Sequence, residues 1–199
     1  MKNSKPPYDF RNVKISRLPP LPEPLDPLIH EILSDTASRG GSILNLHLTK
    51  AHAPKLSLAG RPLTRALRND CVSSRLLREI AIVRTSILVG CDYELHHHRP
   101  LVLAAGLSEA QFAALKDWRA QQHLFDDKQQ AVLAYVDAVM LNKGDVDDAT
   151  FAAMEKNFSA QEIVELTLCA THYYGSGLFM KAMRIEIDAP GKKAAPGRF

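Results

Sequence analysis

The chain has 199 residues, 46% of them hydrophobic, which is enough material for one well-buried domain. Its formal charge of +3 is small and spread along the chain apart from the ends, which argues against a nucleic-acid-binding protein with a concentrated basic face. No apolar run reaches the length of a membrane span, and MKNSKPPYDF at the start lacks the apolar core of a signal peptide. We therefore expect a cytoplasmic protein with no membrane or nucleic-acid partner.

The cysteine pattern gives no sign of a structural cross-link or a metal site. Cys71, Cys91 and Cys169 are odd in number and widely separated, and no C-x-x-C or zinc-type spacing occurs. We therefore expect neither a disulfide framework nor a bound metal, and nothing in the sequence indicates a cofactor.

The first 27 residues are predicted to form an extended arm, because their proline density excludes a helix or a central strand. Such an arm can lie over the domain or over a neighbouring subunit, and a disordered leader is the alternative. The prolines are Pro6, Pro7, Pro19, Pro20, Pro22, Pro24 and Pro27.

Residues 28–188 are predicted to form one all-α domain. Apolar residues recur at helical spacing from Ile29 onward, and no segment alternates between apolar and polar residues as a half-buried strand does. Helix caps recur at intervals that fit about eight helices. The tail at 189–199 is basic, rich in small residues and predicted to be flexible. The clearest caps are the capping boxes Ser108–Gln111, Asp126–Gln129 and Ser159–Glu162.

Four titratable residues in the middle of the chain are the candidate site. A helix predicted over residues 73–89 carries Glu79, and the next helix begins near Cys91. At about 100° per residue, Cys91, Glu94 and His98 fall on one narrow face of that second helix. We therefore expect a thiol, a carboxyl group and an imidazole to face the same space.

Two kinds of chemistry fit this face. A cysteine beside an imidazole ionises more readily, and a carboxylate such as Glu79 can orient that imidazole. Alternatively, Glu94 and His98 form an acid/base pair that exchanges protons near neutral pH. The residues alone leave both chemistries open, and a purely structural buried pair is the third interpretation.

The spacing of the four residues resembles a known family. Glu79, eleven residues, Cys91, two residues, Glu94, three residues and His98 is similar to the E-x11-C-x2-C-x3-H arrangement of the carboxymuconolactone decarboxylase and alkylhydroperoxidase D superfamily. Weaker similarity extends to the segments ILNLHLTKAHAP and VELTLCATHYYGSGLFMKAM. The resemblance implies an all-α, single-domain bundle that assembles as a trimer or hexamer, with sites near subunit contacts.

The chain departs from this pattern at Glu94, which occupies the position of the second cysteine of the redox pair. A carboxylate cannot close a disulfide, so the dithiol peroxidase cycle of the family cannot run in this motif. The resemblance therefore implies the decarboxylase-like branch, whose members often lack the cysteine pair.

We expect a cofactor-free lyase or isomerase that acts on a small carboxylated lactone or enol acid. Loss of carbon dioxide leaves electron density that flows into a conjugated carbonyl, and Glu94 or His98 then delivers a proton. Arg84 or Arg99 is the candidate for binding the substrate carboxylate. The alternatives are a single-cysteine peroxide or thiol reductase that uses Cys91, and a non-catalytic oligomeric binding protein.

Overall fold

The computed structural model describes residues 15–38 and 42–192, and within these ranges the protein consists of nine α-helices and one 3-10 helix, with no strand. The expected all-α fold is confirmed. None of these helices is long and apolar enough to cross a membrane. The elements are α1 (Pro27–Ser38), α2 (Asn45–Lys50), α3 (Pro54–Asn69), α4 (Arg75–Val89), α5 (Asp92–Ala104), α6 (Glu109–Ala114), η1 (Leu115–Leu124), α7 (Asp127–Leu141), α8 (Asp148–Asn157) and α9 (Ala160–Met183).

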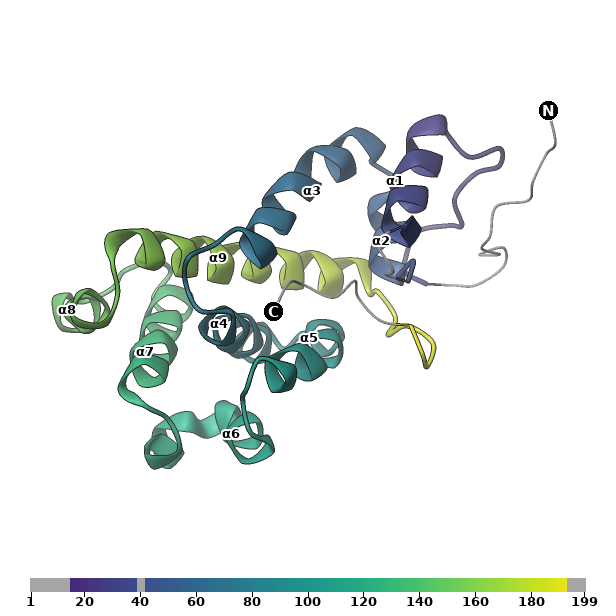
Figure 1. Ribbon diagram of the computed structural model, residues 1–199. Coiled ribbons are helices and arrows are strands. Elements are labelled where there is room, and N and C mark those ends of the chain that lie inside the picture. The colour runs from purple at the N-terminus through teal and green to yellow at the C-terminus, as the bar shows by residue number, and fades with distance from the viewer. Residues whose placement is uncertain (1–14, 39–41, 193–199) are drawn as a thin grey trace.

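Helix α4 lies at the centre of the molecule, with α5, α7 and α9 packed around it (Figure 1). Its side chains are buried on nearly every face, and Ile80, Ala81 and Val83 have no exposed surface. A helix that is buried nearly all round is stable only where its neighbours cover it. For the same reason, Glu79 on this helix has no exposed surface either.

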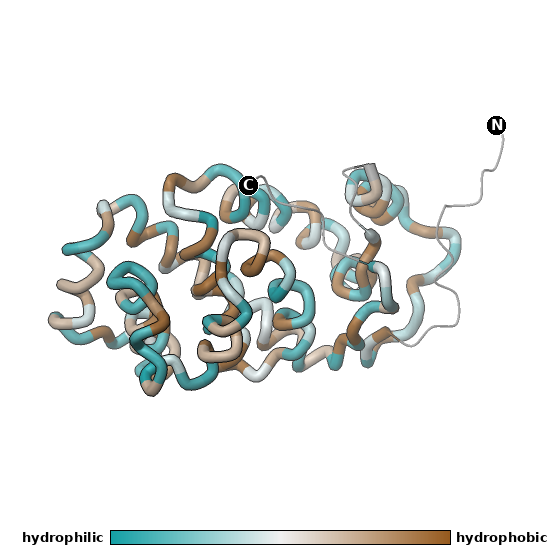
Figure 2. Tube along the Cα trace, turned by 60° about the horizontal axis from the view of Figure 1, so that its bottom comes forward, coloured by the Kyte–Doolittle hydropathy of each residue, from teal (hydrophilic) through white to brown (hydrophobic). Residues whose placement is uncertain are grey.

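Helices α1, α2 and α3 gather near one end of the long helix α9, and α8 lies at its other end (Figure 1). A separate apolar cluster holds α1 against α2. Apolar and polar positions are interspersed along the helices, the pattern of amphipathic elements that bury one face (Figure 2). Helix α9 therefore connects the core around α4 to α1–α3. The cluster consists of Ile29, Leu33, Ile43, Leu48 and Ala51.

The three predicted capping boxes are confirmed, since each cap side chain accepts a hydrogen bond from the backbone N–H three residues later. The helix that follows the Ser108 cap is short. It ends at Ala114, and η1 follows, with non-helical dihedral angles at Asp117 and Gln121. The change of path lets the Trp118 indole N–H donate to Asp137 Oδ2 at 2.9 Å.

The described part of the proline-rich arm lies on the domain. The Arg17 N–H donates to the carbonyl of Met183 at 2.9 Å, and the Glu186 N–H donates to the carbonyl of Ile15 at 3.0 Å. Residues 15–17 therefore pair with the segment that follows α9. The rest of the predicted arm, 1–14, and the end of the predicted tail, 193–199, lie outside the described residues.

Candidate active site

The turn between α4 and α5 sets the two site-bearing helices side by side. Gly90 ends α4 in the left-handed conformation (φ 68°), which glycine adopts without strain. Cys91 is the residue that caps α5, not its first helical residue. Because α5 then packs back along α4, its buried face meets Glu79.

His98 lies between two carboxyl groups. Its Nδ1 is 2.7 Å from Glu79 Oε2, and its Nε2 is 3.3 Å from Glu94 Oε2. Glu79, Glu94 and His98 are 0%, 5% and 6% exposed. The ring of Tyr173 packs edge-on to the imidazole, with the ring centroids 4.9 Å apart. We call Glu79, His98 and Glu94 the buried triad.

The two carboxyl groups of the triad have opposite protonation preferences. Burial alone would raise the pKa of Glu79, but the charges of His98 and Arg75 and the His98 hydrogen bond outweigh it and lower the pKa. Burial raises the pKa of Glu94, and the charges of His98 and Lys50 oppose this only in part. Glu79 therefore favours the carboxylate, which orients His98, whereas Glu94 favours the acid.

Cys91 is 2% exposed and lies against α9. Burial raises the pKa of its thiol, and the backbone N–H groups of Glu94 and Tyr93 lower it less than burial raises it. Within the described residues, no hydrogen bond joins the Cys91 sulfur to His98. A Cβ on Gly177 of α9 would lie 3.5 Å from the Cys91 Cβ, so the helix backbone closes directly over this residue. The thiol is thus near the triad in the chain but does not take part in its hydrogen bonds.

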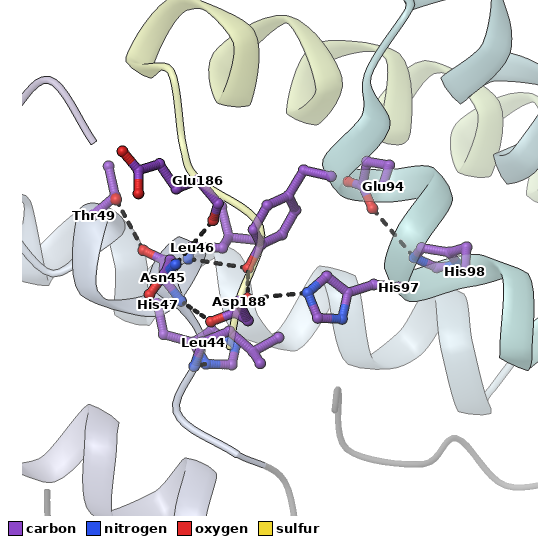
Figure 3. A network of polar contacts seen from close by, with 11 residues as sticks. Leu44, Asn45, Leu46, His47, Thr49, Glu94, His97, His98, Glu186 and Asp188 are labelled. Carbon is purple, nitrogen blue, oxygen red and sulfur yellow. Dashed lines mark hydrogen bonds and ion pairs between the residues drawn. The ribbon is translucent and has the colours of Figure 1, made fainter. Parts of the chain in front are cut away.

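A second polar cluster lies on a neighbouring face of α5. Asp188 Oδ2 accepts a hydrogen bond from the Tyr93 hydroxyl and lies 3.0 Å from His97 Nε2, while its Oδ1 accepts from the Asn45 N–H at 2.8 Å (Figure 3). Burial alone would raise the pKa of Asp188, but these hydrogen bonds outweigh it and lower the pKa. We call this arrangement the Asp188 clamp, because it joins α2 and α5 through the segment after α9.

A cavity of about 600 Å³ lies between α1, α2, α3 and α9. None of the four predicted site residues lines it. Its wall contains Leu46, Phe179 and Met183, which also pack against the apolar cluster that encloses Cys91. On another side the wall contains His172, whose ring packs on Tyr173 behind it. The triad and Cys91 therefore lie one layer of side chains behind the cavity.

Both arginines that we considered for a substrate carboxylate already bind acidic side chains. Arg84 is buried, with its Nε 2.6 Å from Asp137 Oδ1. Arg99 is exposed and donates to both carboxylate oxygens of Glu109 at 2.8 Å. Neither arginine lines the cavity.

Comparison with known proteins finds a family match over the part of the chain that carries the site. The model of the carboxymuconolactone decarboxylase family matches residues 64–138, a range that contains all four predicted site residues. Solved structures of peroxidase-related and alkylhydroperoxidase-like proteins share the fold. Residues 64–138 are thus similar to the carboxymuconolactone decarboxylase family, and the fold is that of alkylhydroperoxidase-like proteins.

Three proteins illustrate what this chain is similar to. Uncharacterized protein YnjA of Escherichia coli (strain K12) is 28% identical over 116 residues, which span 58% of this chain and 62% of that protein. An uncharacterized peroxidase-related protein from Silicibacter sp. TM1040 is 17% identical, with a TM-score of 0.77 over 94% of this chain and 96% of its own. The debrominase Bmp8 is 18% identical, with a TM-score of 0.68 over 89% and 94%. At these identities the two structures show a common fold.

Sequence reasoning placed Glu79, Glu94 and His98 together correctly but missed the Asp188 clamp and the cavity. The spacing within α5 is local, so helical geometry was enough to align Glu94 with His98. Asp188 meets His97 across 91 positions of the chain, and no periodic pattern links such residues. The one available signal was a lone acidic residue in the otherwise small and basic segment DAPGKK.

Proposed function

We propose that this protein is a cofactor-free acid/base enzyme, of the lyase or isomerase type, that acts on a small carboxylated lactone or enol acid. The observation that supports this best is one imidazole held between two buried carboxyl groups, His98 between Glu79 and Glu94. Pairs of carboxyl groups with divergent protonation preferences are typical of acid/base sites.

In the proposed reaction, Glu94 supplies the proton. When the bond to the substrate carboxylate breaks, carbon dioxide leaves and the electron pair passes into the conjugated carbonyl. Glu94 then protonates the resulting enolate and becomes a carboxylate. Its charge is compensated by His98, which Glu79 keeps in place through Nδ1, until a proton from solvent restores the acid.

Carbon dioxide release from carboxymuconolactone and related lactone acids tests this proposal. We expect turnover in the unaltered protein and a loss of about 10²- to 10⁴-fold in Glu94→Gln, since that is the usual contribution of a general acid. Glu109→Gln, which removes a carboxylate at the protein surface, is the matched control and should retain turnover. Full turnover in both Glu94→Gln and His98→Ala would refute the proposal.

A single-cysteine reductase is the second candidate. It rests on the position of Cys91 at the start of α5, where the backbone N–H groups of Glu94 and Tyr93 offset part of the rise that burial causes in the pKa of the thiol. The sulfur would attack a peroxide O–O bond and release an alcohol, leaving a sulfenic acid. Two equivalents of an external thiol would return Cys91 and release water and a disulfide. Peroxide-dependent thiol oxidation that survives in Cys91→Ser would exclude this candidate.

By family resemblance we also propose a homo-oligomer, a trimer or hexamer, in the cytoplasm. Sedimentation velocity of the purified chain distinguishes the two assemblies from a monomer.

The debrominase Bmp8, in the form of a cysteine-to-alanine variant, has been solved with 2,3,4-tribromopyrrole. A small ring compound is therefore a ligand class that this fold accommodates.

A further inference from the structure

The cavity between α1, α2, α3 and α9 is lined by several cationic side chains. Four cationic side chains line it, and the described lining residues include no aspartate or glutamate. Much of the rest of the wall is apolar, with Leu46, Phe179 and Met183 on one side. A cavity of about 600 Å³ is within the usual size of small-molecule sites. The cationic residues are Lys50, Arg61, Arg65 and Arg68.

Two of these cations differ in how they are held. Arg61 pairs with Asp35 at 2.8 Å and donates to the Thr36 hydroxyl and to the carbonyl of Ile32, so its charge is largely compensated within the wall. The Lys50 ammonium makes no hydrogen bond or ion pair with any residue of 15–38 or 42–192. Its described contact is with the face of the Phe179 ring, 5.9 Å from the centroid. Lys50 is therefore a cation that an incoming anion can bind.

We propose that this cavity binds a small organic acid, with the carboxylate on the Lys50 ammonium and the apolar body against Phe179, Leu46 and Met183. The half-buried ammonium lacks an acidic partner in the wall, and a carboxylate supplies one. The inference rests on the proposed function in its choice of a carboxylate as ligand, and it names the residue that recognises that group.

Lys50 also connects the cavity to the buried triad. The Lys50 charge acts to lower the pKa of Glu94, and the Glu94 charge acts to raise the pKa of Lys50. An anion bound to Lys50 neutralises this charge, so Glu94 keeps its proton more firmly. Binding of the substrate carboxylate thus places the acid of the triad in its donating form.

Titration calorimetry with 2-naphthoate, and with the uncharged 2-naphthamide of the same shape, tests the site. We expect one naphthoate per chain and tighter binding than naphthamide. Lys50→Met keeps the apolar stem and removes the charge, so it should weaken naphthoate binding about 10- to 100-fold, the usual worth of a hydrogen bond to a charged group, and leave naphthamide unchanged. Lys55→Met, at an exposed position of α3 outside the cavity, should change neither ligand more than about twofold.

A second variant separates the apolar wall from the charge. Phe179→Leu should weaken both naphthoate and naphthamide by similar factors, since it removes the ring and leaves Lys50 in place. Equal affinity for the two ligands, or equal effects of Lys50→Met and Lys55→Met, would overturn the inference. Glu94→Gln should still bind naphthoate. If Glu94→Gln lowers turnover but the unaltered protein does not bind naphthoate, the cavity site alone is refuted. If the protein binds naphthoate but Glu94→Gln does not lower turnover, the acid/base proposal alone is refuted.

Discussion

Helix α4 takes part in two buried polar clusters that differ in how their charges are satisfied. In one cluster, Arg84 pairs with Asp137, which also accepts the Trp118 indole N–H, and further Arg84 donors reach the carbonyls of Leu115 and Lys116. Asp137 meets the buried Arg84 and, at 3.5 Å, the exposed Arg119, and both Arg84 and Asp137 have further hydrogen-bond partners. Such a network fixes the path of η1 and offers no proton to exchange.

The buried triad is balanced less completely. Glu79 and Glu94 share one imidazole, and only Glu79 has an arginine, Arg75, as a further partner. Burial raises the pKa of the other carboxyl group, Glu94, which therefore favours its protonated form. Glu94 lies behind the wall of the cavity that Lys50 lines. A protein can bury either cluster, but only an unevenly compensated one has a proton available for chemistry. The difference between the two clusters can be tested by removing one charge from each.

Asp137→Ala should have the largest effect on stability. It leaves Arg84 as a buried charge without its carboxylate, which typically costs about 3–5 kcal/mol in free energy of unfolding. Urea unfolding of the purified variant measures this loss. Asp117→Ala, at an exposed residue of η1, is the control and should change the free energy of unfolding by less than about 0.5 kcal/mol. If Asp137→Ala lowered the free energy of unfolding by less than about 1 kcal/mol, Asp137 would not be the group that compensates the charge of Arg84.

Glu79→Gln should have the next largest effect, and its size should depend on pH. The pKa of Glu79 is lowered in the folded protein, so its charge stabilises the fold above the ordinary value of 4.5, and this contribution is lost as pH falls through the folded pKa. We expect a loss of about 2 kcal/mol at pH 7, in the range for hydrogen bonds to charged groups, and a smaller loss at pH 4. Equal losses at both pH values would contradict the assignment of Glu79 as the carboxylate of the triad.

Glu94→Gln should show the opposite pH dependence. The pKa of Glu94 is raised in the folded protein, so the fold keeps this proton after the unfolded chain has lost it, and stability falls as pH rises from 4.5 towards the folded pKa. The amide has no such proton to hold. We therefore expect the variant to match the unaltered protein at pH 4 and to be more stable at pH 7. Urea midpoints across this range provide the measurement, and a destabilised variant at pH 7 would mean that the charged form is the stable one.

Two glycines of α9 test packing without any change of charge. A Cβ on Gly177 would lie 3.1 Å from Val89 Cγ1, whereas a Cβ on Gly175 meets nothing within 4 Å. Gly177→Leu should therefore destabilise the protein by about 1–3 kcal/mol through overpacking next to Cys91. Gly175→Ala should stabilise it by about 0.5–1 kcal/mol through helix propensity. Thermal unfolding of the two variants measures both changes in stability. Equal effects would show that α9 does not pack closely against Val89 at Gly177.

The parts of the molecule that the sequence predicted are those encoded by neighbouring residues. Each capping box spans four positions, and Glu94 and His98 are one helical turn apart, so local geometry decides both. The position of Cys91 as a cap, the path of η1 around Trp118 and the partner of His97 all depend on contacts with distant segments. The role of Lys50 was hidden for the same reason, because the cavity it lines is assembled from four helices and the loop residues Leu18, His52 and Ala53.

The Asp188 clamp has a consequence for folding during synthesis of the chain. Its carboxylate follows all the described helices in the chain, yet it fastens α2 and α5, which are made much earlier. At about 5–20 residues per second, roughly 5 to 20 seconds of translation separate Glu94 from Asp188. A nascent chain that already holds Glu79, Glu94 and His98 therefore lacks the Asp188 clamp until its last described segment emerges. A truncated product lacks the contact that links α2 to α5.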